Sequence, residues 1–315
     1  KEIFEVAGID VNKMSKTVPT GTDAGVITAE AAEKTGLAPS THIVSISHDQ
    51  VSAAIGAGAF DSSVAVDGAG TVECVTPIYD SIPDIEAMYD GYFSIVPYVI
   101  PGKYVAYAFS YTGGALIQWC VDNLAKDEKR AAADRDLSVN EYLEKKYATE
   151  RGEENPSNLL ILPHFAGAAT PYMDTGSKGA ILGLTIDTTV ADIYRGCMEG
   201  VVYEMLVNTS ALKKSGCKFK KLNATGGGAR SGEWMQMKAD MLNVPITALK
   251  TVDAGTVGSA MLTGIATGVF KDLNDAAEHM VEETVEYLPR KEMHEKYMHI
   301  FERYAKVYQA VRPLV

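Results

Sequence analysis

Short apolar runs rich in β-branched residues alternate along this chain with longer segments rich in Ala, Gly and Met. Examples of these runs stand at residues 43–46, 64–66, 159–162 and 244–247. Strands that alternate with helices are typical of α/β architectures, in which helices pack on a sheet. The 315 residues are enough for about two domains of roughly 150 residues each. We therefore expect an α/β protein with two domains or lobes.

The spacing of apolar residues predicts three helices. One covers residues 190–212, a second begins near Ser231, and a third covers residues 291–311 with an aromatic stripe. Such a stripe is typical of packing rather than of chemistry. Residues 126–157 are highly charged and contain few apolar residues, so we expect a helical excursion on the surface.

Composition and charge argue against several classes of protein. Lys and Arg total 29 and Asp and Glu total 41, which gives a net charge of −12 and disfavours a nucleic-acid partner. No apolar run approaches the roughly 18 to 20 residues of a membrane span. Four cysteines without a CxxC pair and six scattered histidines indicate neither a disulfide framework nor a metal site, which fits the reducing cytoplasm. The chain begins at Lys1 without an initiator Met, so we expect a piece of a longer protein with part of its active site upstream.

The segment around Asp49 is the first candidate for chemistry. The apolar run at residues 43–46 ends in polar residues that include Asp49 and Gln50, and small residues that predict close helix packing follow. Ligands of open α/β sheets bind beyond the carboxyl ends of strands, where a carboxylate can take a proton from a hydroxyl during phosphoryl transfer. Asp49 is explained equally well as a helix N-cap, and the local sequence leaves both interpretations open.

Two glycine-rich turns are further candidates. In residues 64–73, strand-like runs flank a turn with Gly70 and Thr71, where bare backbone and a hydroxyl could meet phosphate oxygens. The alternative is an ordinary tight hairpin. In residues 222–231, a strand runs into the triplet 226–228 and a helix start, where a nucleoside could lie against the backbone. The alternative is a flexible loop, and neither segment is a P-loop or a GxGxxG motif.

A fourth segment, residues 111–119, places Gly114 and Gln118 four apart on one helix face. On the local sequence alone we favour a packed helix start with Trp119 in the core. The order of the four segments is more specific than any one of them: a strand-end Asp, a Gly-Thr turn, a Gly-rich helix start and a triple glycine.

This order resembles the C-terminal part of the FGGY family of carbohydrate kinases, from about Ala7 to Gly268. The segment before the HDQ triplet resembles the one that precedes the family's GDQ, GDN or GHD triplet. The matching stretches are AGID, GTDAGVITAEAAEKTGL, HDQVSAAIGAGAF, GAGTVE, TGGALIQW, LPHFAGAATPYMDTGSKGAILGLTIDTT, GCMEGVVYEM, ATGGGARSGEWMQMKADMLNVPI and AGTVGSAMLTGIATG. Together, in this order and spacing, they make the resemblance specific.

The resemblance implies the fold of sugar kinases, actin and Hsp70, which has two ribonuclease-H-like lobes with ATP and sugar in the cleft between them. Residues 1–61 resemble the closing segment of the first, sugar-binding lobe. Residues 62–315 resemble the second, nucleotide-binding lobe with its C-terminal helix. The implied activity is the phosphorylation of a sugar or polyol hydroxyl by ATP with Mg²⁺.

The resemblance also assigns site residues by position. Asp49 matches the catalytic base, and Gln50 matches the neighbour that touches the sugar. The positions that match ATP contacts are Gly70, Thr71, Gly114, Gln118, Gly227, Gly228, Ala229 and Ser231. The family's upstream Asp-Gly-Thr phosphate motif does not occur in this chain. We therefore expect these residues alone to be inactive, because one lobe cannot close over the sugar.

Departures from the family pattern bear on the sugar. Ala168 and Ala169 stand where many pentulose kinases carry Glu-Arg, and Ser47-His48 replaces the more frequent Gly-Gly or Leu-Gly. We expect a xylulokinase-like enzyme without nucleic-acid or membrane partners, and a homodimer is left open. The alternative is a non-catalytic nucleotide-binding module or degenerate kinase, against which the retained Asp49 argues.

Overall fold

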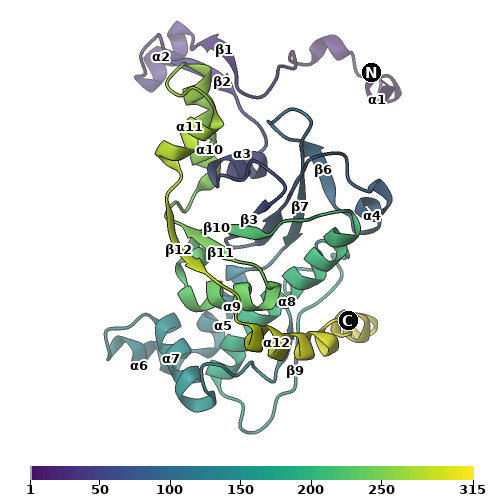
Figure 1. Cartoon of the computed structure of the whole chain (residues 1–315), viewed down its shortest axis with the longest axis vertical. Coiled ribbons are helices and arrows are strands. Elements are labelled where there is room, and N and C mark those ends of the chain that lie inside the picture. The colour runs from purple at the N-terminus through teal and green to yellow at the C-terminus, as the bar shows by residue number, and fades with distance from the viewer. Residues whose placement is uncertain (1) are drawn as a thin grey trace.

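The computed structural model describes residues 2–315 and is built around one eight-stranded mixed sheet (Figure 1). The strands run in the order β12-β11-β10-β3-β4-β7-β5, and β6 pairs with β7. Their bounds are β3 Val64–Ala69, β4 Glu73–Thr76, β5 Ile78–Tyr79, β6 Ser94–Pro97, β7 Tyr104–Ser110, β10 Lys221–Thr225, β11 Ile246–Leu249 and β12 Glu283–Tyr287. β3, β10 and β11 are parallel, whereas β4, β7 and β12 run antiparallel to their neighbours. The loops that follow β3 and β10 therefore leave the sheet at the same edge.

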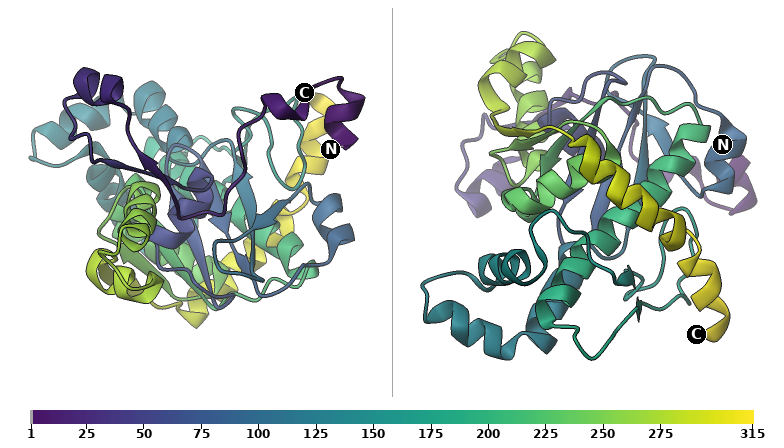
Figure 2. Two further views of the ribbon diagram at one scale, coloured as in Figure 1. Left: turned by 90° about the horizontal axis from the view of Figure 1, so that it is seen from above. Right: turned by 60° about the horizontal axis from the view of Figure 1, so that its bottom comes forward.

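Helices cover both faces of this sheet (Figure 2). One face packs on α5 Gly114–Leu124, α8 Val190–Lys214, α9 Gly232–Leu242 and α12 Lys291–Tyr304. The other face packs on α3 Asp49–Gly56, α10 Ala254–Ala266 and α11 Leu273–Met280. Successive strand residues serve opposite faces, as Ala65 and Val66 do. This two-sided burial explains the apolar run at residues 64–66.

The N-terminal part forms an arm beside this body, at the top of Figure 1. Its elements are α1 Glu2–Val6, the 3₁₀ turn η1 Val11–Lys13, β1 Thr22–Val26, α2 Ala29–Thr35 and β2 His42–Ser45, with β1 and β2 paired antiparallel. Apolar side chains on the arm, such as Ile3, Val6 and Ile43, are exposed, and Ala32 alone among its described residues is a buried apolar residue. The apolar core therefore lies almost wholly in the body that follows.

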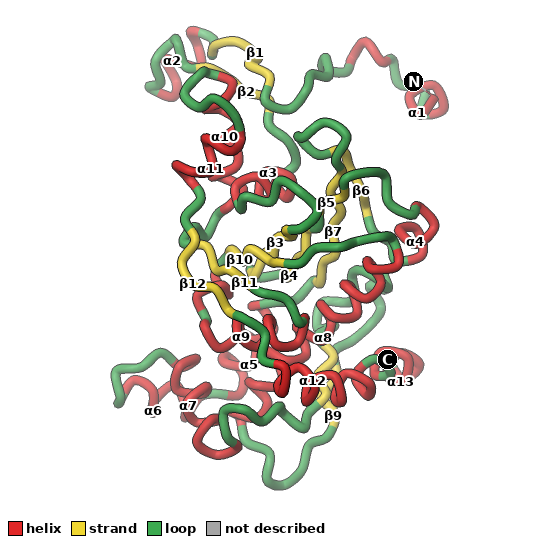
Figure 3. The backbone as a smooth tube through the Cα atoms, viewed as in Figure 1, coloured by secondary structure: helices red, strands yellow, loops and turns green. Residues whose placement is uncertain are grey.

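The remaining elements are α4 Ile85–Asp90, α6 Lys126–Ala133, α7 Val139–Arg151, β8 Leu160–Leu162, β9 Ala180–Leu182, η2 Gly227–Arg230, α13 Val307–Val311 and η3 Arg312–Leu314. Of these, α6, α7, β9 and α13 lie in the lower part of the molecule and α4 lies beside the sheet (Figure 3). The charged excursion is helical as predicted, but Leu143 and Tyr147 are buried in the apolar core that α8 shares. Between residues 2 and 315, none of the helices has the length and apolar character required to cross a membrane.

Two of the three predicted helices are confirmed, and the third is divided. α8 and α9 match the expected helices at residues 190–212 and after Ser231, which caps α9. The single helix expected over residues 291–311 is wrong, because α12 ends at Tyr304 and α13 begins at Val307. Both of these residues are buried, so the apolar spacing continues through the break and cannot reveal it.

Candidate active site

The turn between β3 and β4 carries Gly70 and Thr71 at the edge of the sheet. Ala69 and Glu73 face each other across the two strands, so residues 70–72 make the whole turn. This is the tight hairpin that the sequence leaves as an alternative. Thr71 is exposed at its tip, so the hairpin geometry also leaves the hydroxyl open to a ligand.

The start of α5 docks onto this turn through its backbone. The Gly114 N–H donates to the Gly70 carbonyl oxygen over 2.8 Å, and the Gly113 N–H donates to the Thr71 carbonyl oxygen over 2.9 Å. A Cβ atom on Gly114 would stand only 2.8 Å from the Gly70 oxygen. Only glycine fits this contact, so the fourth predicted segment lies directly against the second.

The loop after β10 packs on the same turn. Gly226 has a φ of +96°, and a Cβ atom there would stand 2.5 Å from the Ala69 carbonyl oxygen. A Cβ atom on Gly228 would stand 2.6 Å from the Trp234 ring. Gly227, by contrast, is exposed and would meet nothing within 4 Å. Two of the three glycines are therefore required by close packing, and the middle one faces open space.

We call these loops, residues 70–71, 113–114 and 226–228, the glycine cradle. The parallel pairing of β3 with β10, in which Gly68 faces Thr225, brings its first and third loops to one edge of the sheet. Successive bare backbone groups on such a surface can approach phosphate or ribose oxygens without an intervening side chain. The structure thus assembles three segments that are up to about 150 residues apart in the sequence into one surface.

Three other predicted ATP positions have structural surroundings of their own. Ala229 is buried behind the cradle, and Gln118 is exposed on α5 one turn beyond Gly114. The Ser231 hydroxyl accepts a backbone N–H of α9 and donates to Glu144 Oε1 over 3.2 Å. Burial raises the pKa of Glu144 to about 7. Ser231 therefore serves as a helix cap, and its role towards a nucleotide stays a prediction.

Asp49 is the first residue of α3, and its side chain is open. His48 occupies the N-cap position, so the N-cap interpretation of Asp49 is wrong. Asp49 Oδ1 accepts the N–H of Gln50 over 2.7 Å and lies 3.1 Å from His48 Nε2. The Asp49 side chain is 78% exposed, while Gln50 beside it is half-buried. A carboxylate held at a helix start in this way is favoured by the helix dipole and accessible to a substrate.

The position of α3, and with it Asp49, is fixed by a close crossing with α10. A Cβ atom on Gly258 would stand 1.9 Å from the Ser52 carbonyl oxygen. A Cβ atom on Gly56 would stand 1.9 Å from the Ala254 carbonyl oxygen. The two backbones are thus in direct contact, as the small residues after Asp49 predict.

Sequence reasoning missed a cluster of buried charges beneath the hairpin turn. Lys238 Nζ lies 2.7 Å from Asp67 Oδ2 and 2.5 Å from Glu73 Oε1, and all three side chains are almost completely inaccessible. The available signal was the presence of Asp67 and Glu73 on either side of the Gly-Ala-Gly-Thr turn in otherwise apolar strands.

Tyr107 on β7 was also missed. Its ring packs beside that of His48 at a centroid distance of 5.5 Å. Burial raises the pKa of Tyr107 to about 12, and the nearby charge of Asp49 adds to this effect. The hydroxyl is buried and meets no hydrogen-bond partner among residues 2–315. Tyr107 therefore stays a neutral phenol near the start of α3.

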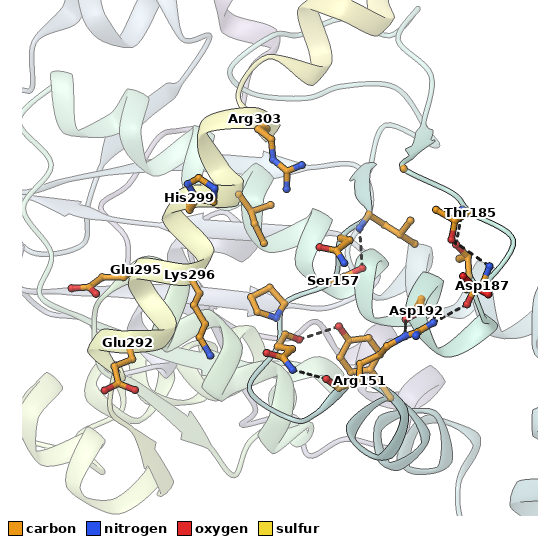
Figure 4. A pocket seen from close by; sticks show the side chains of 18 residues that line it. Arg151, Ser157, Thr185, Asp187, Asp192, Glu292, Glu295, Lys296, His299 and Arg303 are labelled. Atoms are coloured by element: carbon orange, nitrogen blue, oxygen red, sulfur yellow. Dashed lines mark hydrogen bonds and ion pairs between the residues drawn. The ribbon is translucent and has the colours of Figure 1, made fainter.

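A cavity of about 1260 Å³ lies between α7, the loop before α8, and α12 (Figure 4). Arg151 forms two hydrogen bonds with Asp192 on one wall. Lys296, His299 and Arg303 line the α12 wall. None of the predicted site residues lines this cavity.

Two family profiles match the chain. The profile "FGGY family of carbohydrate kinases, C-terminal domain" matches residues 70–267, which is more than half of the chain, and the profile of the N-terminal domain matches residues 1–56. The chain belongs to the FGGY family of carbohydrate kinases. The resemblance stated from the motifs is confirmed, and Asp49 falls within the N-terminal match while the glycine cradle falls within the C-terminal one.

Curated relatives of this FGGY chain include xylulose and glycerol kinases. It is 26% identical over 288 residues to a xylulose kinase from Staphylococcus epidermidis, which covers 91% of this chain and 54% of the relative. It is 32% identical over 221 residues to a glycerol kinase from Aquifex aeolicus, which covers 69% of this chain and 41% of the relative. The chain thus spans about half the length of the curated relatives it matches.

Solved structures share the fold of this FGGY chain. A xylulose kinase from Lactobacillus acidophilus superposes with a TM-score of 0.84 at 23% identity, covering 99% of this chain and 60% of that structure. Plasmodium falciparum glycerol kinase with ADP superposes with a TM-score of 0.78 at 17% identity, covering 98% and 59%. The expected actin-like α/β fold is confirmed.

Proposed function

We propose that this protein transfers the γ-phosphoryl group of ATP to a hydroxyl of a sugar or polyol. The observation that carries the proposal is the glycine cradle: two bare backbone loops, at residues 113–114 and 226–228, pack on the turn that follows β3. The exposed carboxylate of Asp49 lies on the helix that follows β2. Membership of the FGGY family supports the same reaction. This activity is proposed for the whole protein. The xylulose kinase relative is nearly twice as long as the stretch of it that this chain matches.

In this proposal the glycine cradle binds ATP. The exposed Thr71 binds phosphate oxygens, and Gly70 beside it leaves their approach free of a side chain. The open space at Gly227, next to the packed Gly228, holds the adenosine. Fixed N–H donors stabilise the charge that spreads over the transferring group, which supplies most of the rate in phosphoryl transfer. Mg²⁺ enters with ATP as part of the substrate. Residues 2–315 contain no group of three or more His, Cys, Asp or Glu side chains placed to hold a metal ion.

Asp49 is the general base in this proposal. Its exposed carboxylate takes the proton of the attacking hydroxyl as that oxygen bonds to the γ-phosphorus and the bond to the β-phosphate oxygen breaks. Gln50, half-buried beside it, orients the sugar. Gln118 and Ser231 contribute at the edge of the nucleotide site.

We place the substrate among the pentuloses, as in a xylulokinase-like enzyme, because xylulose kinases are among the relatives on both sequence and fold. We assign residues 1–61 to the sugar-binding lobe and residues 62–315 to the nucleotide-binding lobe. The exposed apolar side chains of the N-terminal arm, which ends with β2, support a separate first part. α3, although within residues 1–61, packs on α10 of the body that follows. The four free cysteines are compatible with work in the reducing cytoplasm.

The test is Asp49→Asn in the full-length protein, assayed with ATP and a panel of pentuloses, hexuloses, glycerol and gluconate. Loss of general-base catalysis should lower kcat by about 10²- to 10⁴-fold while ATP still binds. Asp127→Asn, at a 91% exposed aspartate on α6, is the matched control and should leave kcat unchanged.

Wild-type turnover in Asp49→Asn would refute the base. If the wild-type protein binds ATP but releases no ADP with any member of the panel, the protein is a non-catalytic nucleotide-binding module instead.

A further inference from the structure

Lys238 is a cation enclosed completely within the protein, directly beneath the glycine cradle. It lies on α9 with no exposed side-chain surface, between Asp67 of β3 and Glu73 of β4. Its ammonium group also stands over the Trp234 ring, 4.4 Å from the centroid. A buried ammonium group requires such partners, since an unpaired charge would be strongly destabilising there.

Two buried carboxyl groups face a single cation in this cluster. Asp67 Oδ1 and Glu73 Oε2 are buried and have no partner if both carboxyl groups are ionised. Burial, together with the charge of Asp67, raises the pKa of Glu73 well above its usual value. A proton on Glu73 would let it donate to Asp67, and the cluster would then consist of one cation, one carboxylate and one neutral acid.

The cluster joins the two ends of the hairpin turn to the helix that follows the triple glycine. Asp67 precedes Gly70 on β3, and Glu73 follows Thr71 on β4. Lys238 and Trp234 lie on α9, and the Trp234 ring packs against Gly228. A single network of side chains thus supports both the turn at residues 70–71 and the loop at residues 226–228.

We propose that Asp67, Glu73 and Lys238 are positioning residues for ATP: they hold the turn at residues 70–71 in register with the loop at residues 226–228. This rests on the proposed function of the cradle. Ion pairs inside proteins add little stability compared with apolar packing, but their short, directional contacts define one geometry. The cluster therefore acts on the spacing of the cradle loops and not on the reacting atoms.

The test measures MgADP binding by calorimetry and steady-state kinetics in the full-length protein. Lys238→Met leaves Asp67 buried without its cation, so the dissociation constant for MgADP and the KM for ATP should rise about tenfold or more. The KM for the sugar should stay within about twofold, because the cluster lies under the nucleotide site alone. Glu73→Gln supplies the same hydrogen bonds as a protonated Glu73 and is the conservative control, with MgADP binding close to the wild type.

Rescue distinguishes positioning from general stability. The double variant Asp67→Asn with Lys238→Gln replaces the ion pair by a neutral hydrogen-bonded pair and should recover most of the MgADP affinity lost in Lys238→Met. If Lys238→Met does not fold, Glu73→Val takes its place and should weaken MgADP binding in the same way.

The outcomes separate the two proposals. A wild-type protein that binds no MgADP overturns the proposed function of the cradle, and the inference with it. The positioning role alone is overturned if the wild-type protein binds MgADP and the Lys238→Met or Glu73→Val variant has a lower melting temperature but the same MgADP affinity. A Glu73→Gln variant as weak as Lys238→Met overturns the neutral state of Glu73.

Discussion

Replacement of Gly258 by alanine is expected to displace the start of α3 and to slow phosphoryl transfer. The new Cβ atom would stand 1.9 Å from the Ser52 carbonyl oxygen, whereas a Cβ atom essentially never comes within 3.0 Å of a non-bonded heavy atom of a distant residue. Subtracting the 1.9 Å contact from the 3.0 Å limit shows that α3 and α10 must move apart by about 1.1 Å or more. A shift of about 1 Å in a catalytic group can lower turnover about 10²-fold. Asp49 lies at the first position of α3, so kcat should fall by about this factor.

The stability and binding effects of Gly258→Ala should be smaller. Overpacking costs about 1–3 kcal/mol, and the better helix propensity of alanine offsets about 1 kcal/mol of it. MgADP affinity should be unchanged, because the glycine cradle is fixed to the sheet and not to α10.

Gly255→Ala is the matched control on the same helix. A Cβ atom there meets Asp253 Oδ1 at 3.4 Å and the Asp49 carbonyl oxygen at 3.6 Å, which are ordinary contacts. This variant should keep its kcat and gain up to about 1 kcal/mol in the free energy of unfolding. Denaturant unfolding, ADP-release kinetics and calorimetry measure the three quantities. A Gly258→Ala protein that is destabilised yet turns over at the wild-type rate would refute the dependence of Asp49 on this crossing.

Three further predictions concern the open position of Gly227, the raised pKa of Glu144 and the burial of Leu143. Gly227→Ala should weaken MgADP binding about tenfold in calorimetry without lowering the melting temperature, since its Cβ atom meets only the space assigned to the nucleotide; unchanged affinity would remove Gly227 from the site. Because burial raises the pKa of Glu144 to about 7, the fold favours the neutral carboxyl; this stabilisation is complete below pH 4.5 and is lost as the pH rises through 7. Glu144→Gln should therefore reduce the change in the free energy of urea unfolding across this pH range by up to about 3 kcal/mol, and an unchanged pH profile would contradict the prediction. Leu143→Ala should lower the free energy of unfolding by about 2–5 kcal/mol because Leu143 is completely buried, whereas a loss below about 0.5 kcal/mol would mean that α7 is only a solvated excursion.

The elements that could be predicted from sequence are those whose signal is local. Alternating apolar runs predicted the α/β class, and apolar spacing located α8 and α9 because a helix face repeats within a few residues. The glycines at 70, 114 and 226–228 could be singled out for a similar reason. Gly114, Gly226 and Gly228 are required by close contacts that a Cβ atom would violate, and Gly226 also has a positive φ. Gly70 and Gly227 have no such contact, so their selection rests on their place in the motifs.

The features that could not be predicted depend on pairings across long stretches of chain. Lys238 stands 171 residues from Asp67, and nothing around it in the sequence distinguishes a buried ammonium group from an exposed one. The burial of Leu143 in a charged segment has the same origin, because its partner α8 begins almost 50 residues later. The exposed position of Asp49 follows from the crossing of α3 with α10, which is likewise a tertiary contact.

The two proposed roles, nucleotide binding and general-base catalysis, depend on elements that pack on opposite faces of one sheet. The cluster under the glycine cradle belongs with α9, whereas Asp49 is carried by α3, which packs with α10 on the other face. Gly258 packs on Ser52 and Gly56, whereas Lys238 is held by Asp67, Glu73 and the Trp234 ring. Perturbations without shared partners act independently. A substitution in the Lys238 cluster should therefore change nucleotide affinity, and a substitution at the crossing of α3 and α10 should change kcat. The sheet lies between the two groups of residues, so each can shift without moving the other.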